Sequence, residues 1–474
     1  MVKALQTMRA VRPDVIRATR AHTMLRCFGR GFRGNVNGLH KVSFATEKIE
    51  EFWSHSWHTS AWMKVFALWF VNNGHAAGVL GMLSALVACI LCLLEVLPLD
   101  VGQGVKYPWC ALFGTLGYYL TLLQWRRRKK VFVDVVCIDQ ADDEFKALAL
   151  ISIPAILQRS EGMLVMWDPT WANRLWCVFE LAAFLHSRPA NEKVRLLIRP
   201  TVLGPVLLAI SLGLTVATLA FSSNFAEDHV IYWPRTLGIV MIVSSSCLLV
   251  STHLLRLFCR SIDTLQKQLE NFHIEDTHCT CCDCDHIESG TGRPLLCDRK
   301  ILHEVIISWF GSIEKFEREV RGRVRTTLLR QIFSVGFVYS HFCAVASCVS
   351  WYFMDLVVWE VINGEVFNGN AALTKVVLAG LRALVWWLAL EPTVLIHGLA
   401  LCWLLRNRYS QYLAIELLVT SSSMIIPSFV LIGLVLLEVL LDPGTSVPGA
   451  VVFAAVMAGV VTVSWCFACR CFPR

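Results

Sequence analysis

Long apolar stretches recur along this chain of 474 residues and constrain its fold more than any other feature. A helix that crosses a bilayer needs about 20 mostly apolar residues. Eight stretches meet or nearly meet this length: Ala76–Pro98, Pro108–Trp125, Val202–Phe221, Thr236–Leu255, Ile332–Met354, Ala383–Leu405, Leu413–Leu441 and Pro448–Phe467. Hydrophobic residues make up 55% of the chain and charged residues only 17%, which is atypical of soluble domains. We therefore expect a mostly α-helical, multi-pass membrane protein with about eight spans.

Basic residues flank these stretches unevenly and predict an orientation. Arg126–Lys130 follows the second stretch, Arg256 and Arg260 follow the fourth, and Arg406 follows the sixth. Lys and Arg accumulate on the cytoplasmic side of membrane proteins, so an even number of spans places both termini in the cytoplasm. The lipid bilayer is the expected partner. The net charge of +7 is too small to indicate a nucleic-acid partner.

The N-terminal 47 residues are basic. The first 34 contain eight Lys or Arg residues and a single acid, Asp14. This composition predicts a flexible tail lying on anionic lipid, or alternatively an organelle transit peptide.

A different pattern follows the second apolar stretch. Short β-branched or apolar runs alternate there with helical segments, which indicates a parallel α/β sheet. The expected strands are Val131–Ile138, Met163–Trp167 and Lys193–Ile198, and the expected helices are Glu144–Arg159 and Trp171–His186. A further strand and helix, Lys48–Trp57 and Ala61–Val71, precede the first apolar stretch. An alternative is that Lys48–Val71 is only an amphipathic segment at the membrane surface.

These patterns divide the chain into six parts. The α/β domain is expected to be split, with a membrane hairpin inserted into it. The parts are a tail (1–47), the split α/β domain (48–75 plus 126–200), the inserted hairpin (76–125), a second hairpin (201–257), a cytoplasmic Cys/His-rich segment with an amphipathic helix at Arg299–Val324 (258–329) and a four-span domain (330–474).

Four runs in the split domain resemble known families. Phe52–Trp57 is similar to the opening strand of TIR (Toll/interleukin-1 receptor) domains, and Ala155–Ser160 to their second helix. Trp176–Leu181 resembles the WC-x-x-EL run of plant TIR domains, and Val133–Gln140 the D-x-x-C-I-x-Q run of the related HET (heterokaryon-incompatibility) domains. The whole chain is similar to multi-pass proteins of dinoflagellate-type algae. The resemblance implies a small cytoplasmic domain of flavodoxin-like, TIR-like fold that acts in membrane-tethered signalling or assembly through self-association.

The resemblance also implies a possible enzyme. Some TIR domains cleave the nicotinamide–ribose bond of NAD with a glutamate in the helix after the third strand, which is Glu180 here. An oxocarbenium-like ribosyl centre needs a nearby carboxylate. The ligand crevice of a parallel sheet lies at the carboxyl ends of the strands, so the expected NAD-binding residues near Glu180 are Trp53, Ser54, His55, Trp57, Asp139, Asp168 and Trp171. The alternative is that Glu180 serves packing, bonded to Arg174 or to a backbone amide.

Cysteine and histidine gather in the segment that follows the fourth apolar stretch. The candidate metal ligands are Cys279, Cys281, Cys282, Cys284, His286 and Cys297. The pairs Cys279/Cys282 and Cys281/Cys284 have the C-x-x-C spacing that binds zinc. We expect either a structural zinc ion or thiols that are unligated or lipidated.

Ionisable residues inside membrane spans suggest a second function. Glu391 precedes Pro392 within the sixth stretch, and His397 follows less than two turns later. Buried charges often line solute pathways. A transporter or channel with a regulatory cytoplasmic domain is therefore the alternative.

Overall fold

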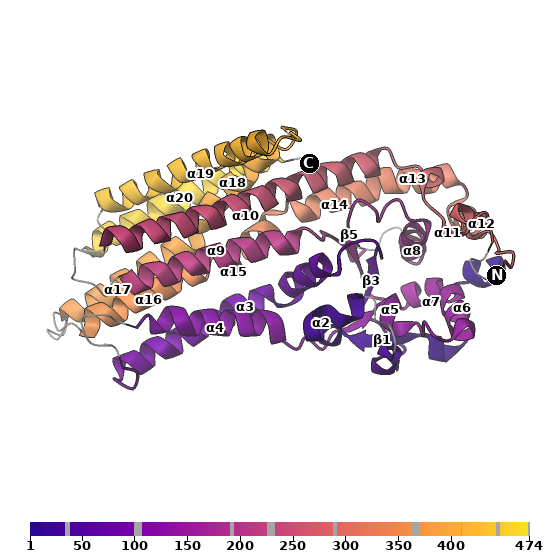
Figure 1. The fold of residues 1–474 in the computed structure, drawn as a ribbon, viewed down its shortest axis with the longest axis horizontal. Helices are drawn as coiled ribbons and strands as arrows, with labels where there is room; N and C mark the ends of the chain where they lie inside the picture. The colour runs from indigo at the N-terminus through magenta and orange to yellow at the C-terminus, as the bar shows by residue number, and fades with distance from the viewer. Residues whose placement is uncertain are drawn as a thin grey trace.

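The computed structural model describes residues 1–33, 38–98, 107–189, 194–224, 233–287, 292–362, 370–408, 410–441 and 446–472. The chain is elongated, with a bundle of long helices at one end and an α/β part at the other (Figure 1). The N-terminus lies at the far end of the α/β part, and the C-terminus lies near the junction of the two parts.

A mixed sheet of six strands forms the centre of the α/β part. The strands are β1 (Arg17–Arg20), β2 (Phe44–Ala45), β3 (Glu51–His55), β4 (Lys130–Phe132), β5 (Met163–Trp167) and β6 (Leu196–Pro200). Their order is β2-β1-β4-β3-β5-β6. Strands β3 to β6 are parallel, whereas β1 runs antiparallel to both β2 and β4. Strand β3 thus joins β4 and β5 in one sheet, although two long helices separate β3 from β4 in sequence.

The N-terminal segment is folded, which contradicts the expected flexible tail. It contributes β1 and β2 to the sheet, together with α1 (Val2–Gln6) and α2 (Ala21–Gly29). Leu5, Val15 and Ile16 are fully buried. The prediction of a tail rested on the basic composition of the segment and overlooked these few apolar residues, each of which packs into the core. Because β1 runs antiparallel to its neighbours, the sheet is mixed rather than wholly parallel as expected.

Two predictions in the α/β part, one of a strand and one of a helix, are corrected by local chemistry. The expected strand Val131–Ile138 ends at Phe132, and α5 (Asp134–Cys137) follows. The carboxylate of Asp134 accepts a hydrogen bond from the amide of Val135, a local contact that favours a turn over a strand. The expected helix Glu144–Arg159 is divided into α6 (Asp143–Ile151) and α7 (Ile153–Gln158), because Pro154 cannot continue a helix.

The bundle contains the long apolar helices. They are α3 (Ala61–Leu93), α4 (Trp109–Gln124), α9 (Leu203–Asn224), α10 (Trp233–Glu270), α15 (Val335–Val345), α16 (Cys348–Ile362), α17 (Asn370–Val385), α18 (Glu391–Leu404), α19 (Leu413–Leu441) and α20 (Val447–Cys471). Within the described residues, six segments are long and apolar enough to cross a membrane: Ala61–Leu93, Leu203–Ser223, Ile313–Val345, Thr374–Leu404, Leu413–Leu441 and Val447–Ala468. The expected count of eight is not reached by this measure. Helix α4 has 16 residues, or about 24 Å, which is short for a hydrocarbon core of about 30 Å.

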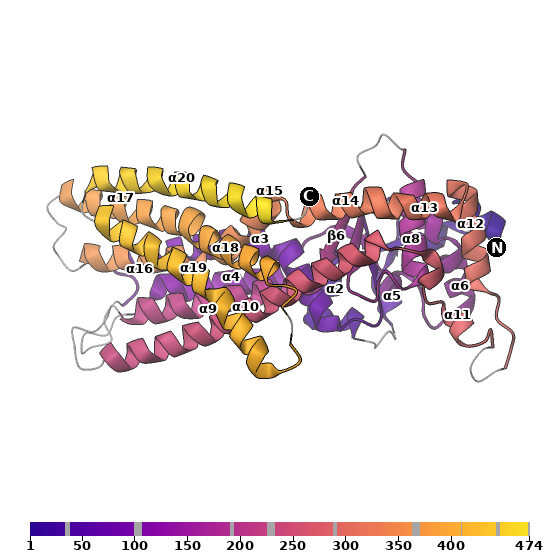
Figure 2. The same cartoon turned by 90° about the horizontal axis from the view of Figure 1, so that it is seen from above.

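Continuous helices connect the two parts. Helix α3 is the next element after β3 and runs for 33 residues into the bundle, so the expected amphipathic stretch Ala61–Val71 and the first span form one continuous helix. Helix α10 leaves the bundle and lies beside the α/β part, as do α13 (Ile313–Glu319) and α14 (Arg325–Ile332) (Figure 2).

The expected amphipathic helix Arg299–Val324 is also interrupted. Helix α12 (Asp298–Phe310) ends at Gly311, which has a φ of 85°, a conformation that glycine adopts without strain. Helix α13 then begins with the side chain of Ser312 accepting a hydrogen bond from the amide of Lys315. Helix α12 packs against α8 (Leu175–His186) and α1.

Candidate functional site

The candidate site lies at the carboxyl end of β3. Ser54 and His55 end this strand, and they pair with Val165 and Met166 of β5. Strand β3 lies between β4 and β5. The next strand in the chain, β4, is added at one edge of β3, and the following strand, β5, is added at its opposite edge. Ligands of open α/β sheets bind in the crevice at such a point of reversal.

Glu180 of α8 meets β3 at this crevice. Its Oε2 atom accepts a hydrogen bond from Ser54 Oγ at 2.5 Å, and Ser54 Oγ accepts one from Trp171 Nε1 at 3.0 Å. Burial raises the pKa of Glu180 to about 8, even though the hydrogen bond from Ser54 opposes this shift. The structure thus brings together three of the residues expected at the site and pairs Glu180 with Ser54 rather than with Arg174.

A second carboxylate holds the other polar side chains of the crevice. Asp134 Oδ2 accepts a hydrogen bond from Trp57 Nε1 at 2.8 Å, and Asp134 Oδ1 lies 3.6 Å from Nδ1 of His55. The ring of Trp57 stacks on that of His55 with centroids 5.9 Å apart, and Trp57 is 45% exposed. Burial lowers the pKa of His55. Trp57 therefore offers an accessible aromatic surface beside a buried polar group.

Asp134 is a site residue that the sequence analysis did not assign. It belongs to the run that resembles HET domains, and it follows β4 by two residues. The available signal was its position just after the carboxyl end of a strand next to β3. The overlong expected strand Val131–Ile138 concealed this signal by placing Asp134 in its interior.

Asp168 lies at the end of β5 and is 5% exposed. Its Oδ1 atom accepts hydrogen bonds from the amide of Thr170 at 2.8 Å and from the Thr170 hydroxyl at 2.5 Å. Its Oδ2 atom is buried without a hydrogen-bond partner among the described residues. Lys64 of α3 is also buried, and its charge interacts with those of Asp168 and Asp134. The crevice is therefore strongly polar beneath its aromatic rim.

Two expected site residues lie elsewhere. Trp53 is 1% exposed and donates a hydrogen bond from Nε1 to Oε2 of Glu51 at 2.8 Å. Because successive side chains of a strand point to opposite faces, Trp53 points away from Ser54, and its ring is not available to a ligand. Asp139 accepts a hydrogen bond from the amide of Ala141 within its own turn, and no described contact joins it to Glu180.

The cysteines and histidine of the Cys/His-rich segment converge. The side chains of Cys281, Cys282, His286 and Cys297 place their ligand atoms within 4.8 Å of one another. Cys279 belongs to a second group with Cys281 and Asp298. Cys284 is exposed and lies outside both groups. Four of the six expected ligands could therefore hold one metal ion together.

The bundle contains its own polar groups. Glu391 lines a cavity of about 240 Å³ together with Arg382, Trp386 and Tyr352. His397 is not among the residues that line it, and its Nδ1 lies 2.7 Å from the carbonyl oxygen of Thr393. The structure thus separates the two intramembrane residues that the sequence analysis had grouped.

Two ion pairs inside the bundle were also missed by sequence reasoning. Arg256 is fully buried and donates to Oε1 of Glu416 at 2.9 Å, and Arg382 donates to Oε1 of Glu438 at 2.7 Å. Both pairs join helices that lie far apart in sequence, so no local pattern reveals them.

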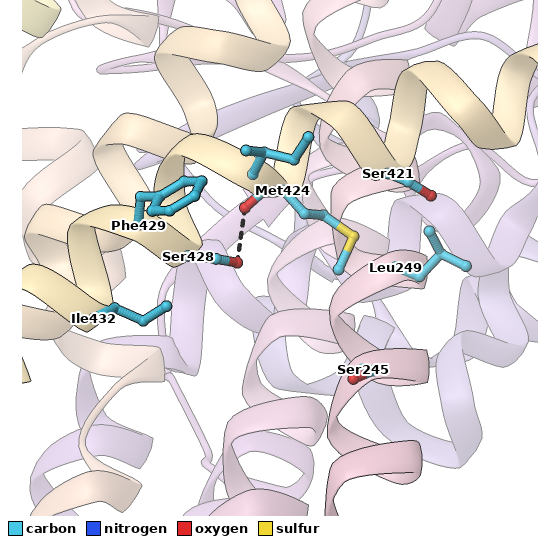
Figure 3. A pocket seen from close by; sticks show the side chains of 8 residues that line it. Ser245, Leu249, Ser421, Met424, Ser428, Phe429 and Ile432 are labelled. Atoms are coloured by element: carbon cyan, nitrogen blue, oxygen red, sulfur yellow. Dashed lines mark hydrogen bonds between the residues drawn. The ribbon is translucent and has the colours of Figure 1, made fainter.

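A separate groove of about 430 Å³ lies between α10 and α19 (Figure 3). No charged side chain is among the described residues that line it, and the hydroxyl of Ser428 donates to the carbonyl of Met424 in its own helix at 2.8 Å. This mostly apolar groove therefore carries no group that would select a charged solute.

Comparison of the chain with protein-family models, with curated proteins and with solved structures finds no match.

Proposed function

We infer that this chain is a membrane-tethered signalling or assembly protein whose α/β domain hydrolyses NAD. The observation that carries this proposal is the carboxyl of Glu180, held by Ser54 at the point where the strand order reverses. The four parallel strands follow the order second, first, third, fourth along the sheet, which fits the flavodoxin-like, TIR-like fold implied by the sequence resemblance.

The chemistry assigns a role to each of the contacting groups. Water adds to the ribose carbon as nicotinamide leaves, giving ADP-ribose, nicotinamide and a proton. The carboxylate of Glu180 stabilises the positive charge that develops on the ribose, as in glycoside hydrolysis. Ser54 orients this carboxylate at 2.5 Å. The exposed ring of Trp57 provides a surface on which nicotinamide or adenine stacks.

The raised pKa of Glu180 gives the reaction a characteristic pH dependence. Only the ionised carboxylate stabilises the transition state, and the pKa of Glu180 is about 8. The rate of NAD hydrolysis is therefore expected to increase as the pH rises from 7 to 9.

The test measures nicotinamide release by the full-length protein in detergent and at high density in liposomes. Glu180→Gln keeps the size of the side chain and an oxygen that accepts from Ser54, and it is expected to lower turnover about 100-fold or more. Glu304→Gln changes an exposed glutamate of α12 and serves as the control. Equal turnover in Glu180→Gln and wild type, or no turnover in either setting, would show that the hydrolase proposal is wrong.

The cavity beside Glu391 favours a second candidate, a transporter or channel with a regulatory cytoplasmic domain. A glutamate and an arginine line this cavity inside the bundle, as in sites for charged solutes. Flux of protons or alkali cations into liposomes is expected to fall in Glu391→Gln and to persist in His397→Gln. Absence of flux in the wild type would eliminate this candidate for those ions.

A further inference from the structure

We propose that Cys281, Cys282, His286 and Cys297 bind one zinc ion, which clamps the start of helix α8. The proposal is independent of NAD hydrolysis, because it concerns a site on a different segment of the chain.

The backbone around these residues is bent so that their side chains converge. Asp285 and His286 have φ values of 50° and 58°, a left-handed conformation that is uncommon for residues other than glycine. The bend returns the amide of His286 to the carbonyl of Cys281, at 2.8 Å. The amide of Leu295 then donates to the carbonyl of His286 at 2.7 Å, which carries Cys297 back to the first three residues. Such strain persists where the surrounding structure enforces it, and it is common at ligand sites.

The three distances from Sγ of Cys282 to the other ligand atoms match a tetrahedral zinc ion, and all four ligand atoms lie within 4.8 Å of one another. Zn–S bonds of about 2.3 Å and Zn–N bonds of about 2.0 to 2.1 Å separate two sulfur ligands by about 3.8 Å, and a sulfur from a nitrogen by about 3.6 Å. Sγ of Cys282 lies 4.0 Å from that of Cys281, 3.9 Å from that of Cys297 and 3.6 Å from Nε2 of His286. All three distances agree with the tetrahedral values to within about 0.2 Å.

The donor set selects zinc among common cations. Three thiolates and an imidazole suit zinc, whereas magnesium and calcium prefer oxygen ligands. The amide of Asp298 donates to Sγ of Cys281 at 3.2 Å, which stabilises the negative charge of a thiolate. Because four protein ligands fill the tetrahedron, the ion has no open position for water or substrate, and its role is structural.

The metal segment is joined directly to the start of α8. The amide of Leu175 donates to the carbonyl of His278 at 3.1 Å, and the amide of His278 donates to the carbonyl of Asn173 at 2.6 Å. On the other side of the cluster, Trp176 Nε1 donates to Oδ2 of Asp298 at 3.1 Å. The ion would therefore fix the two stretches of backbone, around His278 and around Asp298, that contact the start of α8.

The first test measures the zinc content of the purified full-length protein by inductively coupled plasma mass spectrometry. One zinc ion per chain is expected in the wild type and in Cys284→Ser, whereas Cys282→Ser and Cys297→Ser are expected to lose it. Cys284 is the matched control because it lies in the same segment but outside the cluster. A wild type purified without zinc, or equal loss in Cys284→Ser, would overturn the proposal.

A second test avoids variants that fail to fold. Metal-free wild type is titrated with Co²⁺, whose absorption spectrum distinguishes tetrahedral thiolate ligation from octahedral ligation. The expected result is a thiolate-to-cobalt charge-transfer band with strong visible bands that disappear when zinc is added. A weak octahedral spectrum, or a disulfide between cluster cysteines found by mass spectrometry, would refute the site.

The clamp itself is tested by hydrogen–deuterium exchange. Removal of zinc is expected to accelerate exchange of the Leu175 amide at the start of α8 and to leave the core strand β5 unchanged. Unchanged exchange at Leu175 would show that the ion does not hold this helix. Neither metal content nor exchange depends on NAD, so failure of this proposal is distinguishable from failure of the hydrolase proposal.

Discussion

Replacing Glu180 by glutamine is expected to change how the stability of the α/β part depends on pH. The ordinary pKa of a glutamate is 4.5, and burial raises that of Glu180 to about 8. Below pH 4.5 the carboxyl is protonated in both the folded and the unfolded chain, so it costs no stability. As the pH rises toward 8, the unfolded chain loses this proton while the folded chain retains it. The folded state is therefore progressively destabilised over this range.

The magnitude follows from the two pKa values. At about 1.4 kcal/mol per pH unit, the penalty is about 1 kcal/mol at pH 5, about 3 kcal/mol at pH 7 and approaches about 5 kcal/mol above pH 8. Glutamine has no proton to lose, and its amide oxygen still accepts from Ser54. The free energy of unfolding of Glu180→Gln should therefore exceed that of the wild type by a margin that grows by about 4 kcal/mol between pH 5 and pH 9.

The assay is unfolding of the detergent-solubilised protein at pH 5, 7 and 9, followed by tryptophan fluorescence, to which Trp171 beside Ser54 contributes. Glu304→Gln, which alters an exposed side chain, is the control variant. A margin for Glu180→Gln that stays constant from pH 5 to pH 9 would refute the reasoning that burial controls this carboxyl.

Two further predictions concern the bundle. Oε1 of Glu416 accepts from both Arg256 and Arg260, at 2.9 Å and 2.7 Å. Glu416→Gln removes the carboxylate that the fully buried Arg256 shares with Arg260 and is expected to cost about 3 to 5 kcal/mol. The triple variant Arg256→Met/Arg260→Met/Glu416→Leu should recover most of the loss in thermal unfolding, and a triple variant no more stable than Glu416→Gln would argue against this prediction. Gly204→Ala places a Cβ 2.1 Å from the backbone nitrogen of Ala67, so α9 must move away from α3. We expect the free energy of unfolding to fall by about 1 to 3 kcal/mol and the melting temperature to fall with it. Gly459→Ala, where a Cβ meets nothing within 4 Å, is the control, and equal melting temperatures for the two alanine variants would contradict the predicted clash.

The outline of the candidate site was accessible from the sequence because its signals are local. The apolar run Met163–Trp167 is fully buried as strand β5, and its length and composition fixed its bounds. The resemblance assigned Glu180, and the position of Ser54 at the carboxyl end of an expected strand placed it near Glu180; the two side chains meet at 2.5 Å. Asp134 was missed because the expected strand was too long, and Lys64 was not predicted because its role depends on the path of α3.

The Cys/His cluster shows the same division. The C-x-x-C spacing predicted a metal site but gave six possible ligands. The left-handed backbone at Asp285 and His286 decides which of them converge, and it leaves Cys284 exposed. Ligand spacing in sequence limits the candidates, whereas the fold of the loop selects among them.

The sequence by itself determined that this protein has long apolar helices and an α/β part, because segment length and hydrophobic periodicity are properties of neighbouring residues. Only the tertiary structure decided that the basic N-terminal segment adds two strands to the sheet, that Arg256 pairs with Glu416, and that β3 lies between β4 and β5. These contacts join residues far apart in the chain. Their stability comes from burial and charge pairing, which exist only once the distant segments have packed together.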